Sequence, residues 1–287
     1  MAPAEDELQK DDPAELRTRQ QHSRRAASFG TAAEDYSRHR PDYPVAAIRW
    51  ALDPITVPVG RAVRILDLGA GTGKLTAQLA GLAVDGGRPD VVAVEPDPQM
   101  LAELRRSLPA VVTVEGRAEA IPLPDRSVDA VLAGQAAHWF SLDRALPEIA
   151  RVLVAGGVFA ALWNTNDDRV GWVSGLHLAS GRRNVIARTT CFDQDDGISA
   201  WLSGPGRRLF CPPEGSGFEH TQVRTAESLI ATMRTHSMFL IMEPAEREAV
   251  LSRVRDYLAA TPQTASGEFR LPIWTITLRS VRRPGSG

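Results

Sequence analysis

The sequence has few cysteines, almost no net charge and no long apolar run. Two cysteines among 287 residues are too few for a disulfide framework and suit a reducing compartment. A formal net charge of −2 gives no overall field that would attract nucleic acid or an anionic membrane surface. No apolar run approaches the ~20 residues of a membrane-spanning helix. We therefore expect a cytoplasmic globular protein with neither nucleic acid nor a membrane as its partner.

Two kinds of catalytic site are also missing. The cysteines, Cys191 and Cys211, do not form a C-x-x-C pair, and no His, Cys and Asp residues have the spacing of metal ligands, so we expect no bound metal. The G-x-S-x-G elbow that carries a nucleophilic serine in many hydrolases is absent. Any catalytic chemistry must therefore come from another kind of site.

The segment from residue 62 to residue 163 alternates short apolar runs with amphipathic runs. We expect strands over 62–70, 90–97, 111–116, 127–135 and 156–164, and helices over 73–83, 98–108 and 143–153. This alternation predicts an α/β fold with a doubly wound, mostly parallel sheet that is covered on both faces. Such a sheet binds its ligand beyond the carboxyl ends of the strands, where the strand order reverses.

The stretch RILDLGAGTGKLT, residues 64–76, joins the first strand to the first helix through Gly69, Gly71 and Gly73. Glycine permits a left-handed backbone and the close approach of another group, and the helix N-terminus beyond the loop favours an anion. A dinucleotide fingerprint needs glycine where Lys74 stands, and a P-loop needs serine or threonine where Leu75 stands. A nicotinamide-dependent oxidoreductase is therefore an alternative that matches this loop incompletely.

Two acidic residues extend this pattern. Asp67 precedes G-x-G-x-G, and Glu95 ends the strand in VVAVEPD. Together these features resemble the motifs of the class I S-adenosylmethionine-dependent methyltransferases. The resemblance implies a Rossmann-like sheet of seven strands and S-adenosylmethionine as the cofactor. It also implies that Glu95 accepts hydrogen bonds from both ribose hydroxyls.

The resemblance continues through GRAEAIPLPDRSVDAVLAGQAAHWF, residues 116–140. Family members commonly carry an aspartate where Arg117 stands, so the backbone N–H of Ala118 is the expected contact to adenine. Arg117 itself has two interpretations, which are stacking on the adenine plane and facing solvent. Gln135 stands where the family lines the methionine part of the cofactor, and Asp129 matches a motif of mainly structural role.

An N-terminal stretch, SFGTAAEDYSRHRPDYP at residues 28–44, resembles the lid of a subgroup that includes trans-aconitate and juvenile-hormone-acid methyltransferases. The resemblance implies that this segment folds over the cofactor. Arg40 is expected to pair with the methionine carboxylate or an acidic substrate, or else to be a surface arginine. The full set of expected cofactor-binding residues is Asp67, Gly69, Ala70, Gly71, Gly73, Glu95, Pro96, Arg117, Ala118, Gln135, Tyr36 and Arg40.

The acceptor side is expected beyond the fourth and fifth strands. His138 is the candidate catalytic residue, either as a hydrogen-bond donor to a carboxylate or as a general base, and its alternative role is to cap the strand. Trp139, Trp163 and Tyr43 are the candidate substrate residues, although aromatic side chains at these positions also suit a core. A carboxylate acceptor needs no base, whereas a hydroxyl acceptor can need one.

We expect a polar tail over residues 1–26 and one methyltransferase domain over 27–287. The expected parts of the domain are a lid (27–60), a cofactor-binding core (61–165), an insertion or substrate cover (166–218), and strands and helices that complete the sheet (219–287). The expected function is S-adenosylmethionine-dependent methyl transfer to a carboxylate or hydroxyl group of a small molecule. The alternatives are the oxidoreductase and a cofactor-binding protein without transfer activity, and the oligomeric state is left open.

Overall fold

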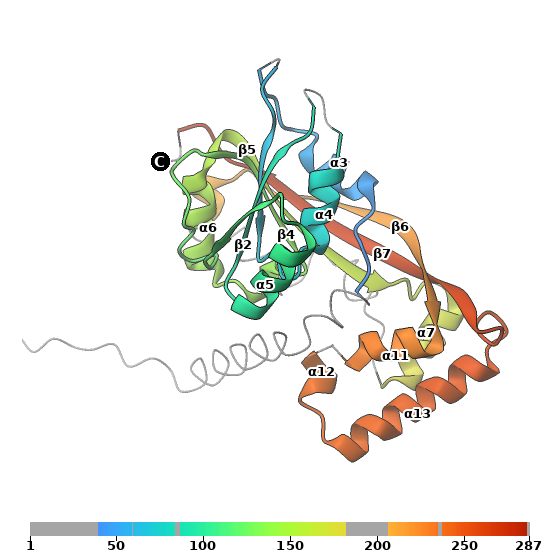
Figure 1. Ribbon diagram of the computed structural model, residues 1–287. Helices are drawn as coiled ribbons and strands as arrows, with labels where there is room; N and C mark the ends of the chain where they lie inside the picture. The colour runs from blue at the N-terminus through green and yellow to red at the C-terminus, as the bar shows by residue number, and fades with distance from the viewer. Residues whose placement is uncertain (1–39, 59, 84–86, 182–205, 235–236, 286–287) are drawn as a thin grey trace, which may run out of the picture.

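The computed structural model describes residues 40–58, 60–83, 87–181, 206–234 and 237–285. These residues form a central sheet with helices on both faces and a group of helices at one end (Figure 1). The expected tail and residues 27–39 of the expected lid, which include Tyr36, lie outside the described residues.

The sheet has seven strands in the order β3-β2-β1-β4-β5-β7-β6. The strands are β1 (Arg64–Leu68), β2 (Asp90–Glu95), β3 (Val112–Glu115), β4 (Val128–Gly134), β5 (Leu153–Asn166), β6 (Glu214–Thr225) and β7 (Glu268–Val281). The first five strands are parallel, and β7 is antiparallel to both β5 and β6. The mostly parallel seven-stranded sheet that we expected is therefore confirmed. Its strand order reverses between β1 and β4, so the carboxyl ends of these two strands define the expected ligand position.

Helices cover the two faces of the sheet at its centre, where strands such as β4 are apolar on both sides. The helices α3 (Val45–Leu52), α4 (Lys74–Gly81) and α5 (Pro98–Ser107) lie on one face, and α6 (Leu142–Val152) and α10 (Gly206–Leu209) lie on the other. Asp97 starts α5 at the end of β2, since its Oδ1 accepts hydrogen bonds from the backbone of Gln99 and Met100. This cap fixes the start of α5 directly after the carboxyl end of β2, at the edge of the sheet where the parallel strands end.

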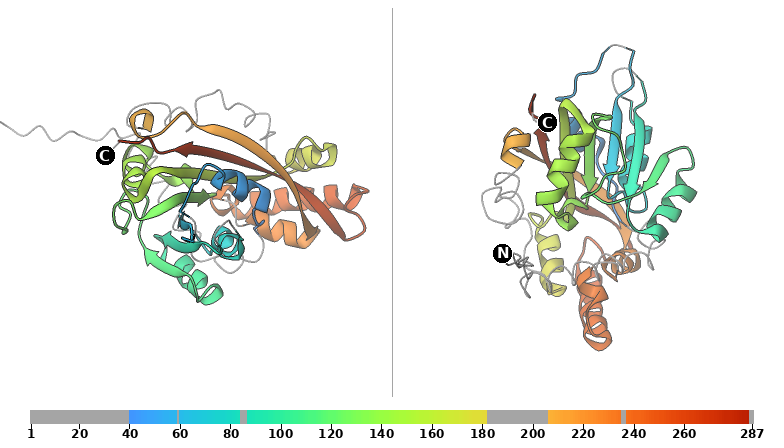
Figure 2. Two further views of the ribbon diagram at one scale, coloured as in Figure 1. Left: turned by 90° about the horizontal axis from the view of Figure 1, so that it is seen from above. Right: turned by 90° about the vertical axis from the view of Figure 1, so that its left-hand side faces the viewer.

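The group of helices beyond the carboxyl end of β5 is called the C-terminal lobe here. It consists of α7 (Gly171–Ala179), α11 (Ala226–Arg234), α12 (Ser237–Leu240) and α13 (Pro244–Ala260), packed against the ends of β6 and β7. Figure 2 shows the two long strands joining the lobe to the body of the sheet. The lobe has a core of its own, which includes Leu176, Leu251 and Phe269. None of the described helices is long and apolar enough to cross a membrane.

The strand boundaries differ from the expected ones at β6. The expected boundary between the insertion (166–218) and the part that completes the sheet (219–287) lies after residue 218, whereas β6 begins at Glu214. In the sequence, Gly215 and Gly217 are typical of a loop. In the structure they lie in a strand, and a Cβ on Gly217 would lie 1.9 Å from the ring of Trp274. The glycine is thus required by an aromatic ring on the neighbouring strand. The expected boundary at residue 218 consequently falls inside a strand.

Candidate functional site

The glycine loop lies at the carboxyl end of β1, and all three of its glycines have positive φ. Gly69 has a φ of 71°, and a Cβ there would lie 2.7 Å from the Cβ of Ala136. A Cβ on Gly73 would lie 3.0 Å from Leu104, whereas the nearest atom to one on Gly71 is a methionine sulfur at 3.7 Å. Close packing within the chain therefore requires Gly69 and Gly73, and the open side of the loop is at Gly71.

Asp67 is the most enclosed charged residue of the site. Its side chain is fully buried, and its Oδ2 accepts a hydrogen bond of 2.6 Å from the hydroxyl of Thr76. Burial raises the pKa of Asp67 to about 7, and the negative charge of Glu95 acts in the same direction. Its Oδ1 and the buried Oγ1 of Thr72 have no hydrogen-bond partner among the described residues. Two buried polar atoms beside the loop can thus bind a further group.

Glu95 joins the end of β2 to the glycine loop. Its Oε2 accepts a hydrogen bond of 2.8 Å from the backbone N–H of Gly71, and its Oε1 accepts one of 2.9 Å from that of Asp97. Burial raises the pKa of Glu95, and these two backbone hydrogen bonds oppose the shift. Each carboxylate oxygen has a second lone pair, so Glu95 can also accept from a ligand.

The remaining expected cofactor residues stand at the same edge of the sheet, but they differ in exposure and in backbone conformation. Arg117 is exposed and Ala118 is buried just beyond β3, while Ala70 and Pro96 flank the loop and the end of β2. Gln135 has an unusual φ of 54° for a non-glycine residue, and its side chain donates to the backbone carbonyl of Asn164. A left-handed backbone of this kind is frequent at functional sites.

Residues 40–44, called the strap here, cross the carboxyl ends of the strands. The carboxylate of Asp42 lies 3.2 Å from the ammonium nitrogen of Lys74, at the start of α4. The side-chain amide of Asn164 donates to the backbone carbonyl of Asp42 at 3.1 Å. The ring of Tyr43 is buried and packs so closely on Gly134 that a Cβ on this glycine would clash with its hydroxyl. The strap therefore links the glycine loop with the ends of β4 and β5.

His138 and Trp163 form a hydrogen-bonded pair on the acceptor side. The Nε1–H of Trp163 donates to Nδ1 of His138 at 3.2 Å, and the ring of Trp139 lies beside the imidazole. An indole nitrogen can only donate, so Nδ1 of His138 accepts and its neutral form carries the proton on Nε2. This arrangement favours His138 as a hydrogen-bond donor over His138 as a base.

The structure brings most of the expected residues to one edge of the sheet and adds two that the sequence analysis did not single out. Thr72 occupies a position of the G-x-G-x-G loop that the motif leaves open, and Asp42 reaches the site through its contacts with Lys74 and Asn164. Asp129 is placed elsewhere, at the opposite edge, where it binds the guanidinium of Arg61 and has the structural role that was expected. Among the described residues, no group of three His, Cys, Asp or Glu side chains can hold a metal ion.

Comparisons with known proteins agree with this geometry. Residues 66–161 match the model of the methyltransferase domain family. An uncharacterised methyltransferase of Mycobacterium tuberculosis is 42% identical over 256 residues, which cover 88% of this chain and 95% of that protein. A malonyl-[acyl-carrier protein] O-methyltransferase of Enterobacter lignolyticus is 36% identical over 138 residues, which cover 47% of this chain and 51% of that protein.

A solved structure from Anaeromyxobacter dehalogenans, assigned as a type II methyltransferase, has the same fold. It superposes with a TM-score of 0.60 at 26% identity and covers 85% of this chain and 97% of that one. The fold and the relatives together define an S-adenosylmethionine-dependent methyltransferase of class I. The chain belongs to this family, so the methyltransferase function expected from the glycine loop is confirmed.

Proposed function

We propose that the edge formed by the glycine loop, Asp67 and Glu95 binds S-adenosylmethionine in this chain. The observation that carries the proposal is the pair of buried polar atoms, Oδ1 of Asp67 and Oγ1 of Thr72, which have no partner among the described residues. A carboxylate with a pKa near 7 beside open main chain suits an ammonium group and a carboxylate on one ligand. The amino-acid end of the cofactor would lie here.

The ribose would lie against Glu95, and the adenine beyond it. Glu95 reaches both the loop and the end of β2, so its carboxylate stands between the amino-acid end and the adenine end of the ligand. The backbone N–H of Ala118 and the exposed Arg117 are the proposed contacts to adenine. Gln135, Arg40 and Tyr36 remain proposed contacts to the cofactor.

Bound S-adenosylmethionine would supply an electrophilic methyl carbon on a sulfonium sulfur. The chain must hold a small-molecule acceptor in line with that carbon and exclude water. His138 would donate from Nε2 to an anionic oxygen of the acceptor, while Trp139, Trp163 and Tyr43 would form the walls of the acceptor site. An oxygen acceptor is supported by the E. lignolyticus relative, whose name specifies O-methylation.

The parts of the chain have proposed roles around this site. Residues 27–60 would act as a lid, 61–165 as the cofactor-binding core, 166–213 as the substrate cover, and 214–287, which begins with β6, as the segment that completes the sheet and adds the helices α11 to α13. The strap supports the first assignment, because it contacts both the glycine loop and β5. The position of α7, which follows the end of β5, supports the cover.

The experiment has two stages. Calorimetry with S-adenosylhomocysteine tests the cofactor, and we expect micromolar binding, whereas binding of NAD(P) without it would favour the oxidoreductase. A metabolite extract is then incubated with the protein and deuterated-methyl cofactor, and mass spectrometry finds the methylated product. Tight cofactor binding without transfer to any compound would favour a cofactor-binding protein that lacks activity.

A further inference from the structure

Asn164, at the end of β5, uses its whole side chain to join separate segments of the chain. Its amide nitrogen Nδ2 donates to the backbone carbonyls of Asp42 at 3.1 Å and of Pro41 at 3.4 Å. Its Oδ1 accepts a hydrogen bond of 2.6 Å from the hydroxyl of Thr275 on β7. Its own backbone carbonyl accepts one of 2.7 Å from the side chain of Gln135. Asn164 therefore links the strap, β7 and the turn after β4 at one point.

Thr275 determines which end of this amide faces the strap. A threonine hydroxyl has one proton, and that of Thr275 is donated to the amide oxygen of Asn164. The amide nitrogen is therefore left to face the strap, where only a donor can satisfy the two backbone carbonyls. Nδ1 of His220, on β6, lies 3.3 Å from the same hydroxyl, so the imidazole is the donor in that contact. The hydrogen bonds thus run in one direction, from β6 through β7 and β5 to the strap.

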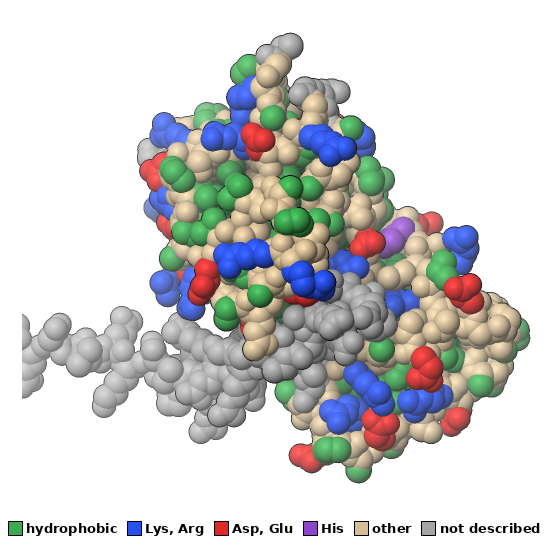
Figure 3. All heavy atoms as spheres, viewed as in Figure 1, with side chains coloured by type: hydrophobic (Ala, Val, Ile, Leu, Met, Phe, Trp, Pro, Cys, Tyr) green, Lys and Arg blue, Asp and Glu red, His purple; other side chains and the backbone are tan. Residues whose placement is uncertain are grey.

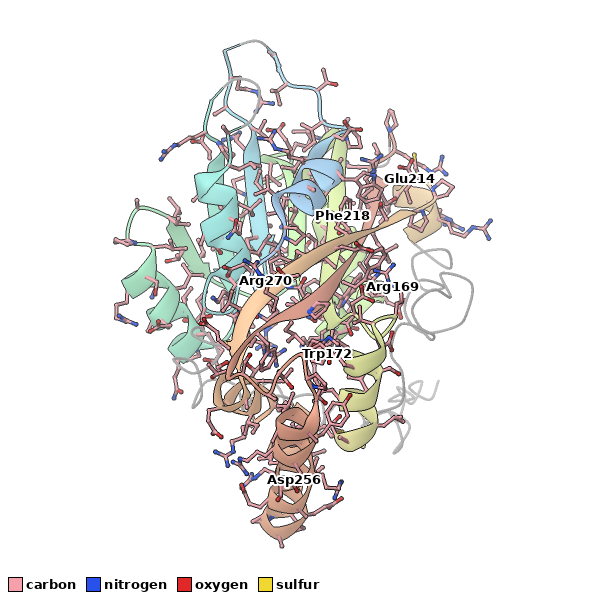
Figure 4. All side chains as sticks on the ribbon, turned by 90° about the vertical axis from the view of Figure 1, so that its right-hand side faces the viewer. Arg169, Trp172, Glu214, Phe218, Asp256 and Arg270 are labelled. Carbon is pink, nitrogen blue, oxygen red and sulfur yellow. The ribbon has the colours of Figure 1, made fainter. Side chains whose placement is uncertain are left out.

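The contact between Thr275 and Asn164 is closed to water. Thr275 is fully buried, and it pairs in register with Asn164 on one side and with Phe218 of β6 on the other. The centroid of the Phe218 ring lies 6.1 Å from that of Trp50 on α3, and Figure 4 shows Phe218 beside this helix. A missing hydrogen bond costs more where water cannot replace the lost partner. The orientation of the Asn164 amide is therefore fixed from inside the sheet.

The strap crosses the point where the strand order of the sheet reverses. Asp42 contacts Lys74, which follows the glycine loop, and Tyr43 packs on Gly134 at the end of β4. Because the strands β1, β4 and β5 are neighbours in this order, these contacts and those of Asn164 carry the strap across the proposed cofactor site. The ion pair of Asp42 and Lys74 is partly exposed, and such pairs contribute little to stability. The backbone contacts with Asn164 therefore matter more for the position of the strap.

We propose that Asn164 is a positioning residue for the cofactor, which holds the strap and the side chain of Gln135 over the methionine end of bound S-adenosylmethionine. This inference rests on the proposed cofactor site and adds to it a residue that acts through its neighbours. A strap held in place slows the escape of the ligand and excludes water from the sulfonium. The contacts of Asn164 should consequently act mainly on the rate at which the cofactor dissociates.

The test measures the dissociation rate of S-adenosylhomocysteine by surface plasmon resonance. Asn164→Asp keeps the acceptor for Thr275 but turns a second oxygen toward the strap carbonyls, so dissociation should become at least about tenfold faster. Thr275→Val keeps the shape but removes the hydroxyl that orients the amide, and the expected increase is about three- to tenfold. Thr275→Ser keeps the hydroxyl, so its rate should stay within about twofold of the wild type.

Thr277→Val is the matched control. Thr277 is fully buried on the same face of β7, and its hydroxyl has no hydrogen-bond partner in the part of the chain that the structure describes. The same substitution at the same depth should therefore leave the dissociation rate within about twofold of the wild type. Hydrogen exchange of the peptide over residues 40–50, measured by mass spectrometry without ligand, should be faster in Asn164→Asp and unchanged in Thr277→Val.

The inference is wrong if Thr275→Val releases the ligand no faster than Thr277→Val, or if Thr275→Ser releases it as fast as Thr275→Val. If Thr275→Val does not fold, Asn164→Asp decides, and an unchanged dissociation rate in that variant would overturn the inference. Failure of the proposed function gives a different result. The wild type would then not bind S-adenosylhomocysteine at all, which rejects the cofactor site and this inference together, whereas equal rates in proteins that bind reject the inference alone.

Discussion

The cofactor edge and the C-terminal lobe are built in different ways from the sequence. At the cofactor edge, Glu95 binds the backbone of Gly71, which is 24 positions away, and both residues lie at the ends of adjacent strands. In the C-terminal lobe, the hydroxyl of Tyr257 on α13 donates to the backbone carbonyl of Trp172 on α7, which is 85 positions away. Short sequence motifs define the first region, whereas contacts between residues far apart in the sequence define the second.

The two regions also differ in what their polar residues contact. Asp67 and Glu95 are buried against the main chain of a loop that packs tightly on its own protein. Around the lobe, charged residues are spread over the surface, as Figure 3 shows, and Arg224 is an exception that is buried. The polar residues of the cofactor edge are thus fixed by hydrogen bonds to neighbouring groups, whereas most charged residues on the surface of the lobe face solvent.

The largest effect is expected from Gly69→Ala, which tests whether packing within the chain sets the cofactor edge. Alanine would have to adopt a φ of 71° and place its Cβ 2.7 Å from that of Ala136. Strain and overpacking together should lower the free energy of unfolding by about 2–4 kcal/mol. Chemical denaturation measures this change. Gly81→Ala, where nothing lies within 4 Å, is the control and should be neutral or slightly stabilising; equal stability of the two variants would contradict the argument.

The second-largest effect is expected from a change at Glu95, whose carboxylate joins the glycine loop to the end of β2. Glu95→Gln should weaken binding of S-adenosylhomocysteine by about 1.5–3 kcal/mol, because it removes a charged acceptor of hydrogen bonds. Calorimetry gives the dissociation constant. Glu115→Gln is a matched control, since Glu115 is exposed and pairs in register with Glu95 on the neighbouring strand. An unchanged dissociation constant for Glu95→Gln would show that the ribose does not bind at Glu95.

The comparison also explains how much the sequence could predict. The five parallel strands and their helices were predictable because apolar runs and amphipathic runs alternate within about thirty residues of one another, and the loop was predictable from Asp67 and its glycines. The first residues of β6 were not predictable, because Gly217 is typical of a loop in the sequence, whereas in the structure the ring of Trp274 leaves no room for a side chain at this position. A packing requirement between distant residues produces no periodic pattern of apolar residues in the sequence, so it cannot be predicted from the sequence.

The site was predictable to a similar extent. Asp67 and Glu95 stand at the ends of β1 and β2, His138 follows β4, and the carboxyl ends of parallel strands meet at one edge. Thr275 has no such position. In the sequence it is one polar residue in a strand of mixed composition, and only its hydrogen bond to Asn164, 111 positions away, distinguishes it.

A pH titration sharpens the contrast, because among the residues that the structure describes only the cofactor edge has a carboxylate whose pKa is raised to about 7. Ionised Asp67 attracts the ammonium group of the ligand, and protonation below its pKa removes this attraction. Binding of S-adenosylhomocysteine should therefore weaken about tenfold when the pH falls from 8 to 6, since the ionised fraction falls from about 0.9 to about 0.1. Calorimetry at several pH values checks this. Asp67→Asn should bind weakly at every pH, and a variant that keeps the full pH dependence would show that another group titrates.

The smallest effect is expected on the acceptor side, at the pair of His138 and Trp163. Trp163→Phe removes the N–H that donates to Nδ1 of the imidazole, so the ring loses the contact that orients its Nε2–H. One hydrogen bond of this kind contributes about 0.5–1.5 kcal/mol, which corresponds to a decrease of roughly 2–13-fold in kcat/KM for the acceptor. Nitrogen chemical shifts of His138, measured by NMR, should show Nε2–H in the wild type and a free Nδ1 in the variant.

Trp139→Phe changes the other ring beside the imidazole and serves as the control. It should leave the nitrogen shifts as they are, because the donor to Nδ1 is Trp163. If instead Trp163→Phe raises kcat/KM while Nδ1 becomes available, His138 acts as a base and the indole restrains it. That outcome would assign proton removal to this edge and point to an acceptor that carries a proton at neutral pH, rather than to a carboxylate.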